Sequence, residues 1–235
     1  MTADVDCYDT LDDQVALVTG ATRGIGAEIA ADLADRGATV YAGARDPGDV
    51  TADDQRPIEL DVTDDEEVQS ALDRVAGETN RLDILVNNAG IFERAESLEA
   101  MSMDAFDRTM AVNHRGPVLV TKHALPLLRE RDGARVVTLS SGLGQFSQGQ
   151  MGGGYPAYRL SKVGVGGLTA YLHAEYGGEG LLANAADPGW VQTDMGGSGA
   201  PRSPEEGADT PAWLCRFRPG SPAGRLWRDR ETITW

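Results

Sequence analysis

The chain is poor in cysteine, histidine and long apolar runs, and each shortage argues against a class of protein. Only Cys7 and Cys215 occur in 235 residues, which is too few for a disulfide framework. Neither these cysteines nor the three histidines are spaced like metal ligands, so we expect no metal site. No apolar run reaches the roughly 18 to 20 residues that cross a bilayer, and the first ten residues are acidic where a signal peptide would be basic. We therefore expect a cytoplasmic protein that does not bind membranes.

Positive charge is also scarce. The net charge is −16 at pH 7, which argues against binding to a phosphate backbone, so we do not expect nucleic acid as a partner. Lys122 and Lys162 are the only lysines among the 21 basic residues. An acidic, lysine-poor surface suits a protein that stays soluble in concentrated salt, as in a halophile. An acidic protein from a genome that favours arginine would look the same, and both interpretations remain open.

The rest of the composition is that of an ordinary globular protein, with 41% hydrophobic and 25% charged residues, and short apolar segments alternate with amphipathic ones. The apolar segments predict strands at 14–19, 39–44, 57–62, 82–90, 134–141 and 181–189. The amphipathic segments predict helices at 27–37, 64–78, 103–133 and 156–176. We expect a loop at 45–56, a tail rich in Pro and Gly at 196–224, and a short edge strand within 224–235. This alternation predicts an α/β fold with helices on both faces of a doubly wound parallel sheet.

A glycine-rich segment, TGATRGIG at 19–26, lies between the first predicted strand and the first predicted helix. Gly20, Gly24 and Gly26 would let the backbone turn tightly and approach a pyrophosphate, which the amides at the start of the helix would then bind. The alternative is a plain strand-to-helix turn. The order of strand, glycine turn and helix favours the nucleotide site.

The segment YPAYRLSK at 155–162 contains two tyrosines and a lysine. Tyr158 and Lys162 are four residues apart, a spacing that places both on one helix face. The same spacing is common where an aromatic side chain simply packs, so the segment alone leaves a catalytic and a packing interpretation open. Tyr155 has Arg159 at the equivalent position, and a planar guanidinium does not replace a compact ammonium, so we expect Tyr155 to line a pocket or pack.

Five motifs occur in the order typical of one enzyme family. They are TGATRGIG at 19–26, LDV at 60–62, NNAG at 87–90, the serine pair 140–141 followed by Tyr158-x-x-x-Lys162, and PGWVQTD at 188–194. The chain therefore resembles the short-chain dehydrogenase/reductase family along nearly its whole length. The resemblance implies a Rossmann-like fold in a single domain of residues 1–235, with a cofactor half at about 12–115 and a catalytic and substrate half at about 116–235.

The resemblance also implies roles for four side chains. Tyr158 would protonate the substrate carbonyl oxygen, Ser141 would hydrogen-bond that oxygen, with Ser140 as a structural neighbour, and Asn113 would support a water-linked proton relay. Lys162 would bind the nicotinamide ribose and lower the pKa of Tyr158. An unperturbed phenol titrates near pH 10, so we expect the adjacent ammonium to bring Tyr158 toward working pH.

The family's cofactor contacts fall on the positions of this chain that match its motifs. They are Gly20, Thr22, Arg23, Gly24, Ile25, Gly26, Arg45, Asp61, Val62, Asn88, Ala89, Gly90, Tyr158, Lys162, Pro188, Gly189, Val191 and Thr193. The second strand ends in Ala44 and Arg45, where an acidic residue would favour NAD by binding the ribose diol. Arg45 together with Arg23 suits a 2′-phosphate, so we expect NADP(H) rather than NAD(H), although Asp46 follows directly.

Within the family, the chain is similar to carbonyl reductases in RVVTLSS at 135–141, DPGWVQTDMGG at 187–197 and SPEEGADTPAWL at 203–214. This implies a small-molecule ketone or aldehyde as substrate, or the corresponding alcohol in reverse. We expect the pocket near residues 142–155, Trp190 and Met195. Two alternatives are a ketoreductase of acyl thioesters and a catalytically silent, NADP-sensing regulatory protein.

The resemblance further implies a homodimer or homotetramer. The contacts would come from the long helix around 103–131 and the helix around 156–176, which carries apolar residues at Val163, Val165, Leu168 and Leu172. The alternative is that these side chains pack only on their own sheet, as helix faces usually do.

Overall fold

A computed structural model describes residues 5–147 and 151–235, and its centre is one eight-stranded sheet. The strand order is β3-β2-β1-β4-β5-β6-β7-β8, and all pairs are parallel except β7 with β8. The strands are β1 (Val15–Thr19), β2 (Thr39–Ala44), β3 (Arg56–Glu59), β4 (Ile84–Asn87), β5 (Arg135–Leu139), β6 (Leu182–Ala186), β7 (Leu226–Arg228) and β8 (Glu231–Ile233). The predicted doubly wound parallel sheet in a single domain is confirmed.

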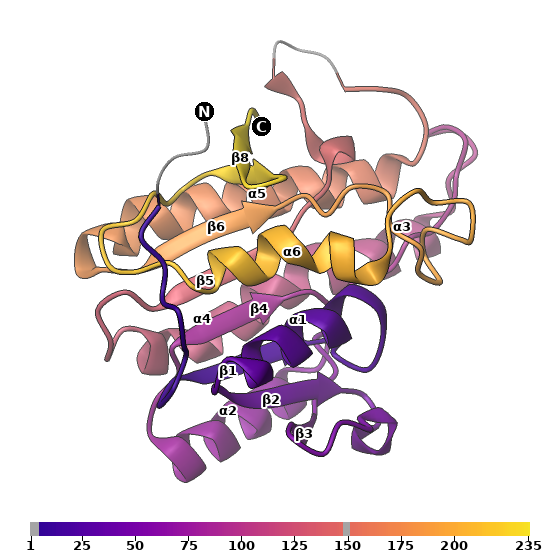
Figure 1. The fold of residues 1–235 in the computed structure, drawn as a ribbon. Helices are drawn as coiled ribbons and strands as arrows, with labels where there is room; N and C mark the ends of the chain where they lie inside the picture. Colours follow the sequence, from indigo (N-terminus) through magenta and orange to yellow (C-terminus); the bar gives the residue numbers. More distant parts are fainter. Residues whose placement is uncertain (1–4, 148–150) are drawn as a thin grey trace.

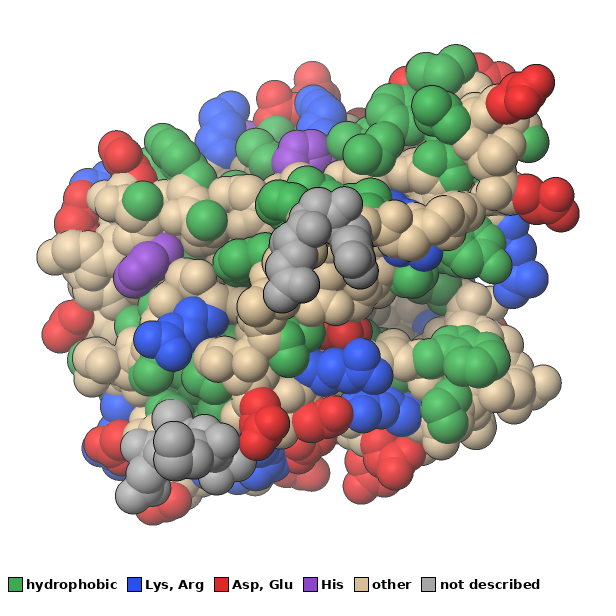
Figure 2. All heavy atoms as spheres, turned by 90° about the horizontal axis from the view of Figure 1, so that it is seen from above, with side chains coloured by type: hydrophobic (Ala, Val, Ile, Leu, Met, Phe, Trp, Pro, Cys, Tyr) green, Lys and Arg blue, Asp and Glu red, His purple; other side chains and the backbone are tan. Residues whose placement is uncertain are grey.

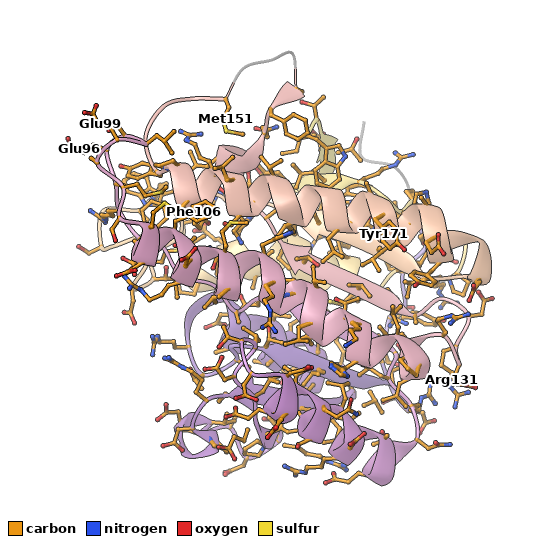
Figure 3. The ribbon with its side chains drawn as sticks, turned by 180° about the vertical axis from the view of Figure 1, so that it is seen from behind. Glu96, Glu99, Phe106, Arg131, Met151 and Tyr171 are labelled. Carbon is orange, nitrogen blue, oxygen red and sulfur yellow. The ribbon has the colours of Figure 1, made fainter. Side chains whose placement is uncertain are left out.

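Helices cover both faces of this sheet (Figures 1 and 3). On one face lie α1 (Gly24–Asp35) and α6 (Pro204–Leu214), and on the other lie α2 (Asp65–Thr79), α3 (Met103–Met110), α4 (Gly116–Leu128) and α5 (Pro156–Tyr176). Two separate clusters of buried apolar side chains fill the layers between the sheet and these two sets of helices. The central strands are buried on both faces, which explains why they read as unbroken apolar runs rather than alternating ones.

The predicted helix at 103–133 is continuous but irregular. It consists of α3, a π-helical segment at Ala111–Arg115 and α4. Single π-helical turns insert one residue into a helix and are frequent at functional sites. This segment contains Asn113, whose side chain is buried.

The tail at 196–224 differs from the prediction, because it contains the helix α6. Ser203 accepts a hydrogen bond from the Glu206 amide, and the Glu206 carboxylate accepts one from the Ser203 amide. This capping box, with Pro204 in the first turn, is a strong start signal that the Pro and Gly content of the tail concealed. The predicted edge strand is instead a pair of short strands, β7 and β8.

Other local predictions hold with smaller changes. The segment between β2 and β3 is irregular, as expected, apart from a 3₁₀ turn, η1, at Pro47–Asp49. Further 3₁₀ turns occur at η3 (Gly142–Gly144) and η5 (Gly177–Glu179). Both cysteines are free thiols. Within the described ranges, no helix combines the length and the hydrophobicity needed to cross a bilayer.

Candidate active site

The glycine-rich turn between β1 and α1 has the backbone shape of a phosphate site. Gly20 and Gly24 have φ values of +65° and +57°, in the left-handed region that favours glycine. A Cβ atom on Gly26 would lie 2.3 Å from both the Asn88 side-chain nitrogen and the Gly20 oxygen. The helix α1 begins at Gly24 without a side-chain cap, so the backbone amides of its first turn are available to bind an anion beside this turn. The remaining predicted residues of the turn are Thr22, Arg23 and Ile25.

The loop after β4 is tied to this turn. The Asn88 side-chain nitrogen donates to the carbonyl oxygens of Thr19 and Gly20, both at 2.9 Å. The Thr19 hydroxyl accepts from the amides of Asn88 and Ala89, both at 3.0 Å. These bonds hold the predicted cofactor residues at 88–90 beside the glycine turn.

At the end of β2, Arg45 is exposed, and the side chain of its neighbour Asp46 is hydrogen-bonded within the following turn. The Asp46 carboxylate accepts the Gly48 amide at 2.9 Å and caps the η1 turn. This local role accounts for the acidic residue that follows Arg45. The third strand is followed by Asp61, which accepts hydrogen bonds from the amide and hydroxyl of Thr63, and by the buried Val62.

Arg23 is paired rather than free. Its Nε atom lies 2.9 Å from Asp194 Oδ2. A Cβ atom on Gly24 would lie 3.0 Å from the Thr193 methyl group, so the segment after β6 packs on the glycine turn. The other predicted residues of that segment are Pro188, Gly189 and Val191.

Tyr158 lies in the first turn of α5 and is buried. The ring of Phe92 meets it edge-on with 4.7 Å between ring centres. Burial raises the pKa of Tyr158 to about 12; a hydrogen bond with Ser141 lowers it and the charge of Asp187 raises it. The net direction is opposite to the one expected from the adjacent lysine, because burial outweighs the other effects. At neutral pH the phenol is therefore protonated and suited to donate.

Lys162 lies one turn further along α5 and is also buried. Its Nζ atom donates to the Leu139 carbonyl oxygen at 2.6 Å and lies 5.5 Å from the centre of the Tyr158 ring. Burial lowers the pKa of Lys162 to about 8, while the charge of Asp187 raises it. Two ammonium hydrogens remain available for other acceptors.

Ser141 follows β5 and begins the η3 turn. Its Oγ atom accepts from the Leu143 amide at 3.1 Å, and its hydroxyl also forms the hydrogen bond with Tyr158 that lowers the pKa of that phenol. The neighbouring Ser140 is buried, and its amide pairs with the Ala186 carbonyl oxygen at 2.7 Å. These positions match a polar role for Ser141 and a structural one for Ser140.

Asn113 joins the long helix to two other parts of the site. Its side chain accepts from the Ile91 amide and donates to the Ile91 carbonyl oxygen, both at 2.8 Å. It also donates to the Ser161 hydroxyl at 3.3 Å, which in turn donates to the Tyr158 carbonyl oxygen at 2.7 Å. The side-chain amide of Asn113 thus links the loop after β4 to the first turn of α5.

Tyr155 differs from Tyr158 in exposure and in backbone conformation. It is 38% exposed and has a left-handed backbone, with φ of +53°. Its amide donates to the Ala95 carbonyl oxygen at 2.8 Å, and its ring lies 4.9 Å from that of Phe92. Tyr155 therefore forms part of an aromatic wall, as expected.

Three features of the site were not predicted. The first is Phe92, whose ring contacts both tyrosines. The second is Arg159, which donates to the carbonyl oxygens of residues 143, 153 and 154 at 3.0, 2.9 and 2.8 Å. The third is the buried Asp187, directly before the matched PG dipeptide. The position of Asp187 beside that motif was the one signal visible in the sequence.

Several large apolar side chains are exposed in the loops near the site. They include Phe146, Trp190 and Met195, and Figure 2 shows hydrophobic side chains beside charged ones on this face of the molecule. Trp190 and Met195 are 59% and 36% exposed, consistent with residues that meet a substrate rather than the core. Of the predicted pocket segment at 142–155, residues 148–150 lie outside the described residues.

Comparison with known proteins agrees with this geometry. A family model described as short chain dehydrogenase matches residues 14–202. D-threitol dehydrogenase of Mycolicibacterium smegmatis is 37% identical over 82% of this chain and 75% of its own length. Carbonyl reductase 1 of Bos taurus, whose name specifies NADPH, is 32% identical over 94% of this chain and 98% of its own. The 3-oxoacyl-acyl-carrier-protein reductase of Escherichia coli is 32% identical over 77% and 75%.

Solved structures share the fold. A short chain dehydrogenase from Burkholderia cenocepacia in complex with NADP superimposes with a TM-score of 0.82 and 30% identity, over 94% of this chain and 97% of the other.

Proposed function

The chain belongs to the short-chain dehydrogenase family, a family of oxidoreductases, and we propose that it is an NADP-dependent reductase of ketones or aldehydes. The reaction is reversible, with the secondary or primary alcohol as product. The observation that carries this proposal is the buried Tyr158 phenol, hydrogen-bonded to Ser141 and beside Lys162 on the same helix.

The chain's own residues fit a nicotinamide nucleotide. The cradle at Gly20, Gly24 and Gly26 leaves no room for side chains, and the start of α1 suits the pyrophosphate. Asp61, Val62 and residues 88–90 would border the adenosine, and residues 188–193 would border the nicotinamide. When bound, the cofactor supplies a hydride to the carbonyl carbon.

Each catalytic side chain then has one task. Tyr158 donates its phenolic proton to the carbonyl oxygen, and its raised pKa keeps that proton in place until the oxygen becomes basic. Ser141, whose hydroxyl is bonded to Tyr158, would donate its hydroxyl hydrogen to the same carbonyl oxygen when the substrate lies between the two groups. Lys162 holds a positive charge beside the phenol and stabilises the phenolate that forms. Asn113 fixes the long helix against α5, where a water-linked relay would return the proton.

The activity is tested with a panel of ketones and aldehydes, with NADPH oxidation followed at 340 nm. We expect turnover of apolar or aromatic carbonyl compounds. Binding of NADPH, measured by fluorescence, without turnover of any compound would favour the regulatory alternative. The retained Tyr158, Lys162, Ser141 and Asn113 argue against that alternative.

The choice of NADP rests on Arg45, which is exposed at the end of β2 while the neighbouring carboxylate is engaged in its own turn. We expect Arg45→Ala to weaken NADPH binding about 10- to 100-fold, the range of a charge-assisted hydrogen bond, and to leave NADH binding nearly unchanged. Fluorescence titration of both cofactors measures this. Equal losses for the two cofactors would contradict a 2′-phosphate site at Arg45.

A ketoreductase of acyl thioesters is the second candidate, and it is favoured by the Escherichia coli relative. An acetoacetyl thioester in the substrate panel separates the two. Turnover of that compound at a kcat/KM far above those of simple ketones would favour the thioester reductase.

A further inference from the structure

Asp187 is a buried carboxylate that the mechanism above does not use. It follows β6 directly, and its side chain is 3% exposed. The Oδ1 atom accepts the Gly189 amide at 2.9 Å, and the Oδ2 atom lies 3.4 Å from Nη1 of Arg228 on β7. Burying a carboxylate this deeply costs folding free energy unless the carboxylate has partners, a cost that an exposed position does not carry.

The strand pairing brings Asp187 to the same end of the sheet as the catalytic lysine. Leu139, whose carbonyl oxygen accepts the Lys162 ammonium, is paired with Ala186, the residue before Asp187. The next bond along, from the Ser140 amide to the Ala186 carbonyl oxygen, keeps the two chain segments adjacent beyond the strands. Asp187 and Lys162 thus both lie at the carboxyl end of β5.

The η3 turn lies between them, and it contacts both. A Cβ atom on Gly142 would lie 3.0 Å from Asp187 Oδ2, and one on Gly144 would lie 2.7 Å from the Cβ of Lys162. Because neither glycine has a side chain, the carboxylate and the lysine can both pack closely against the turn. The Gly142–Gly144 turn carries no charged side chain, so only this thin uncharged turn contacts both groups, and charges in such a buried region are weakly screened.

Ionisable groups lie around the carboxylate on two sides, and Asp229 shares the two arginines among them, at 2.7 Å from Arg202 and 3.8 Å from Arg228. Arg228 on β7 and Arg202, which donates to the Pro188 carbonyl oxygen at 3.4 Å, lie on its solvent side. Lys162 and Tyr158 on α5 lie on its buried side, and the charge of Asp187 raises the pKa of both. Asp187 thus favours the protonated form of each catalytic group.

We propose that Asp187 is a positioning residue of the site, a buried counter-charge that keeps the Lys162 ammonium charged and the Tyr158 phenol protonated. Arg228 sets the strength of this effect, because it neutralises part of the carboxylate's charge from the other side. The consequence for catalysis, which rests on the proposed function, is a site biased toward carbonyl reduction, in which the phenol must start with its proton.

The first test measures Lys162 itself and needs neither cofactor nor activity. With only two lysines in the chain, protein labelled with ¹³C at lysine Cε gives two NMR signals, and Lys122→Arg assigns the remaining one to Lys162. We expect Lys162 to titrate near pH 8. Asp187→Asn keeps an oxygen acceptor for the Gly189 amide, removes the charge and replaces the oxygen that faces Arg228 by an amide nitrogen, so we expect the midpoint to fall by about one pH unit. Arg228→Gln should move it in the opposite direction.

The matched control is Asp209→Asn, which removes a carboxylate that is also paired with an arginine, Arg230, but lies on the exposed side of α6. It should leave the Lys162 midpoint unchanged. Arg228→Gln changes an exposed side chain and keeps the test decisive if Asp187→Asn does not fold. An unchanged midpoint in both variants, or a shift of both in the same direction, would overturn the proposal.

The second test uses the pH dependence of carbonyl reduction. In wild type, kcat/KM should decline above a certain pH. We expect this pH to be about one unit lower in Asp187→Asn and to be higher in Arg228→Gln. A change in kcat/KM at all pH values without a shift would mean that Asp187 serves only the fold, and would overturn the proposal. Failure of the proposed function would appear differently, as normal turnover in Tyr158→Phe, and would leave the NMR result standing.

Discussion

At Lys162, burial and charge act against each other. The ammonium has one carbonyl acceptor in the protein, from Leu139, and burial lowers its pKa to about 8. A group whose folded pKa lies below its unfolded pKa binds fewer protons in the folded state, so stability is lost as pH falls through that interval. The sign is opposite to that of a lysine in a surface ion pair. The site residue therefore costs stability at neutral pH, as active-site groups often do.

We predict that Lys162→Met stabilises the protein while abolishing its activity. Removing the buried charge should raise the free energy of unfolding by about 1 to 3 kcal/mol at pH 7. The difference from wild type should be largest below pH 8 and shrink as pH rises toward 10.5, where the unfolded lysine also loses its proton. Urea unfolding at pH 7 and pH 10 measures both. A variant less stable than wild type at pH 7 would show that the lysine stabilises the fold.

Residue identities at the site were predictable from motif spacing, but their electrostatics were not. The spacing of Tyr158 and Lys162 on one helix face, and the position of Ser141 after an apolar strand, lead to residues that the structure brings together. The direction of the Tyr158 pKa depends on how much water Phe92 and the surrounding loops exclude. No local pattern encodes that, because Phe92 lies in the loop after β4, far from Tyr158 in the sequence.

At the scale of elements, the segment after β5 is held at both ends by one side chain. Arg159 donates to three backbone carbonyl oxygens, one in the η3 turn and two just before α5. The planar guanidinium presents donors in several directions at once, which a lysine or glutamine does not. The guanidinium thus ties the Leu143 end of this segment to the residues just before α5.

We predict that Arg159→Gln raises KM for the carbonyl substrate about tenfold or more, with a smaller effect on kcat and on NADPH affinity. The reason is that the pocket wall would lose its fixed shape, whereas Tyr158 and Lys162 remain in α5. Steady-state kinetics with the best substrate of the panel measures this. Arg131→Gln, at the opposite end of the molecule in Figure 3, is the matched control and should change neither constant. An unchanged KM in Arg159→Gln would exclude this role.

Elements with strong periodic or capping signals were predictable, and those formed by distant pairing were not. The strands β1 to β6 and the helices α1, α2 and α5 agree with their apolar patterns. The strands β7 and β8 are three residues each and exist because β7 pairs with β6 and β8 pairs back on β7. Such short strands have no local signal, since three residues do not establish a period.

For the whole molecule, the structure changes which residues would form a dimer. Val165 and Leu172 are buried in the core, and Leu168 packs against it, so the apolar face expected to meet a second copy mostly meets the sheet. The exposed large apolar residues of these helices instead include Met103 on α3, Val118 on α4, and Leu160 and Tyr171 on α5. The helices α5 and α3–α4 lie side by side there (Figure 3). We propose that a homodimer, alone or within a tetramer, uses these residues.

We predict that the chain sediments as a species of at least about twice its 25.0 kDa mass, and that Tyr171→Asp converts it to monomer. A carboxylate at the centre of an apolar contact is left without a partner, which costs more than the contact gains. Sedimentation velocity at working concentration measures this, with Arg131→Gln as control. A single monomeric wild-type species would refute the proposed dimer.

The central claim is that Tyr158, and not Tyr155, gives the proton to the substrate, and paired phenylalanine substitutions test it most directly. Tyr158→Phe keeps the ring and its contact with Phe92 but removes the donor. We predict that kcat for carbonyl reduction falls by at least about 10² to 10⁴-fold, the contribution of general acid catalysis, while NADPH affinity is nearly unchanged. Tyr155→Phe should retain most activity. Normal turnover in Tyr158→Phe, or loss of activity only in Tyr155→Phe, would contradict the account.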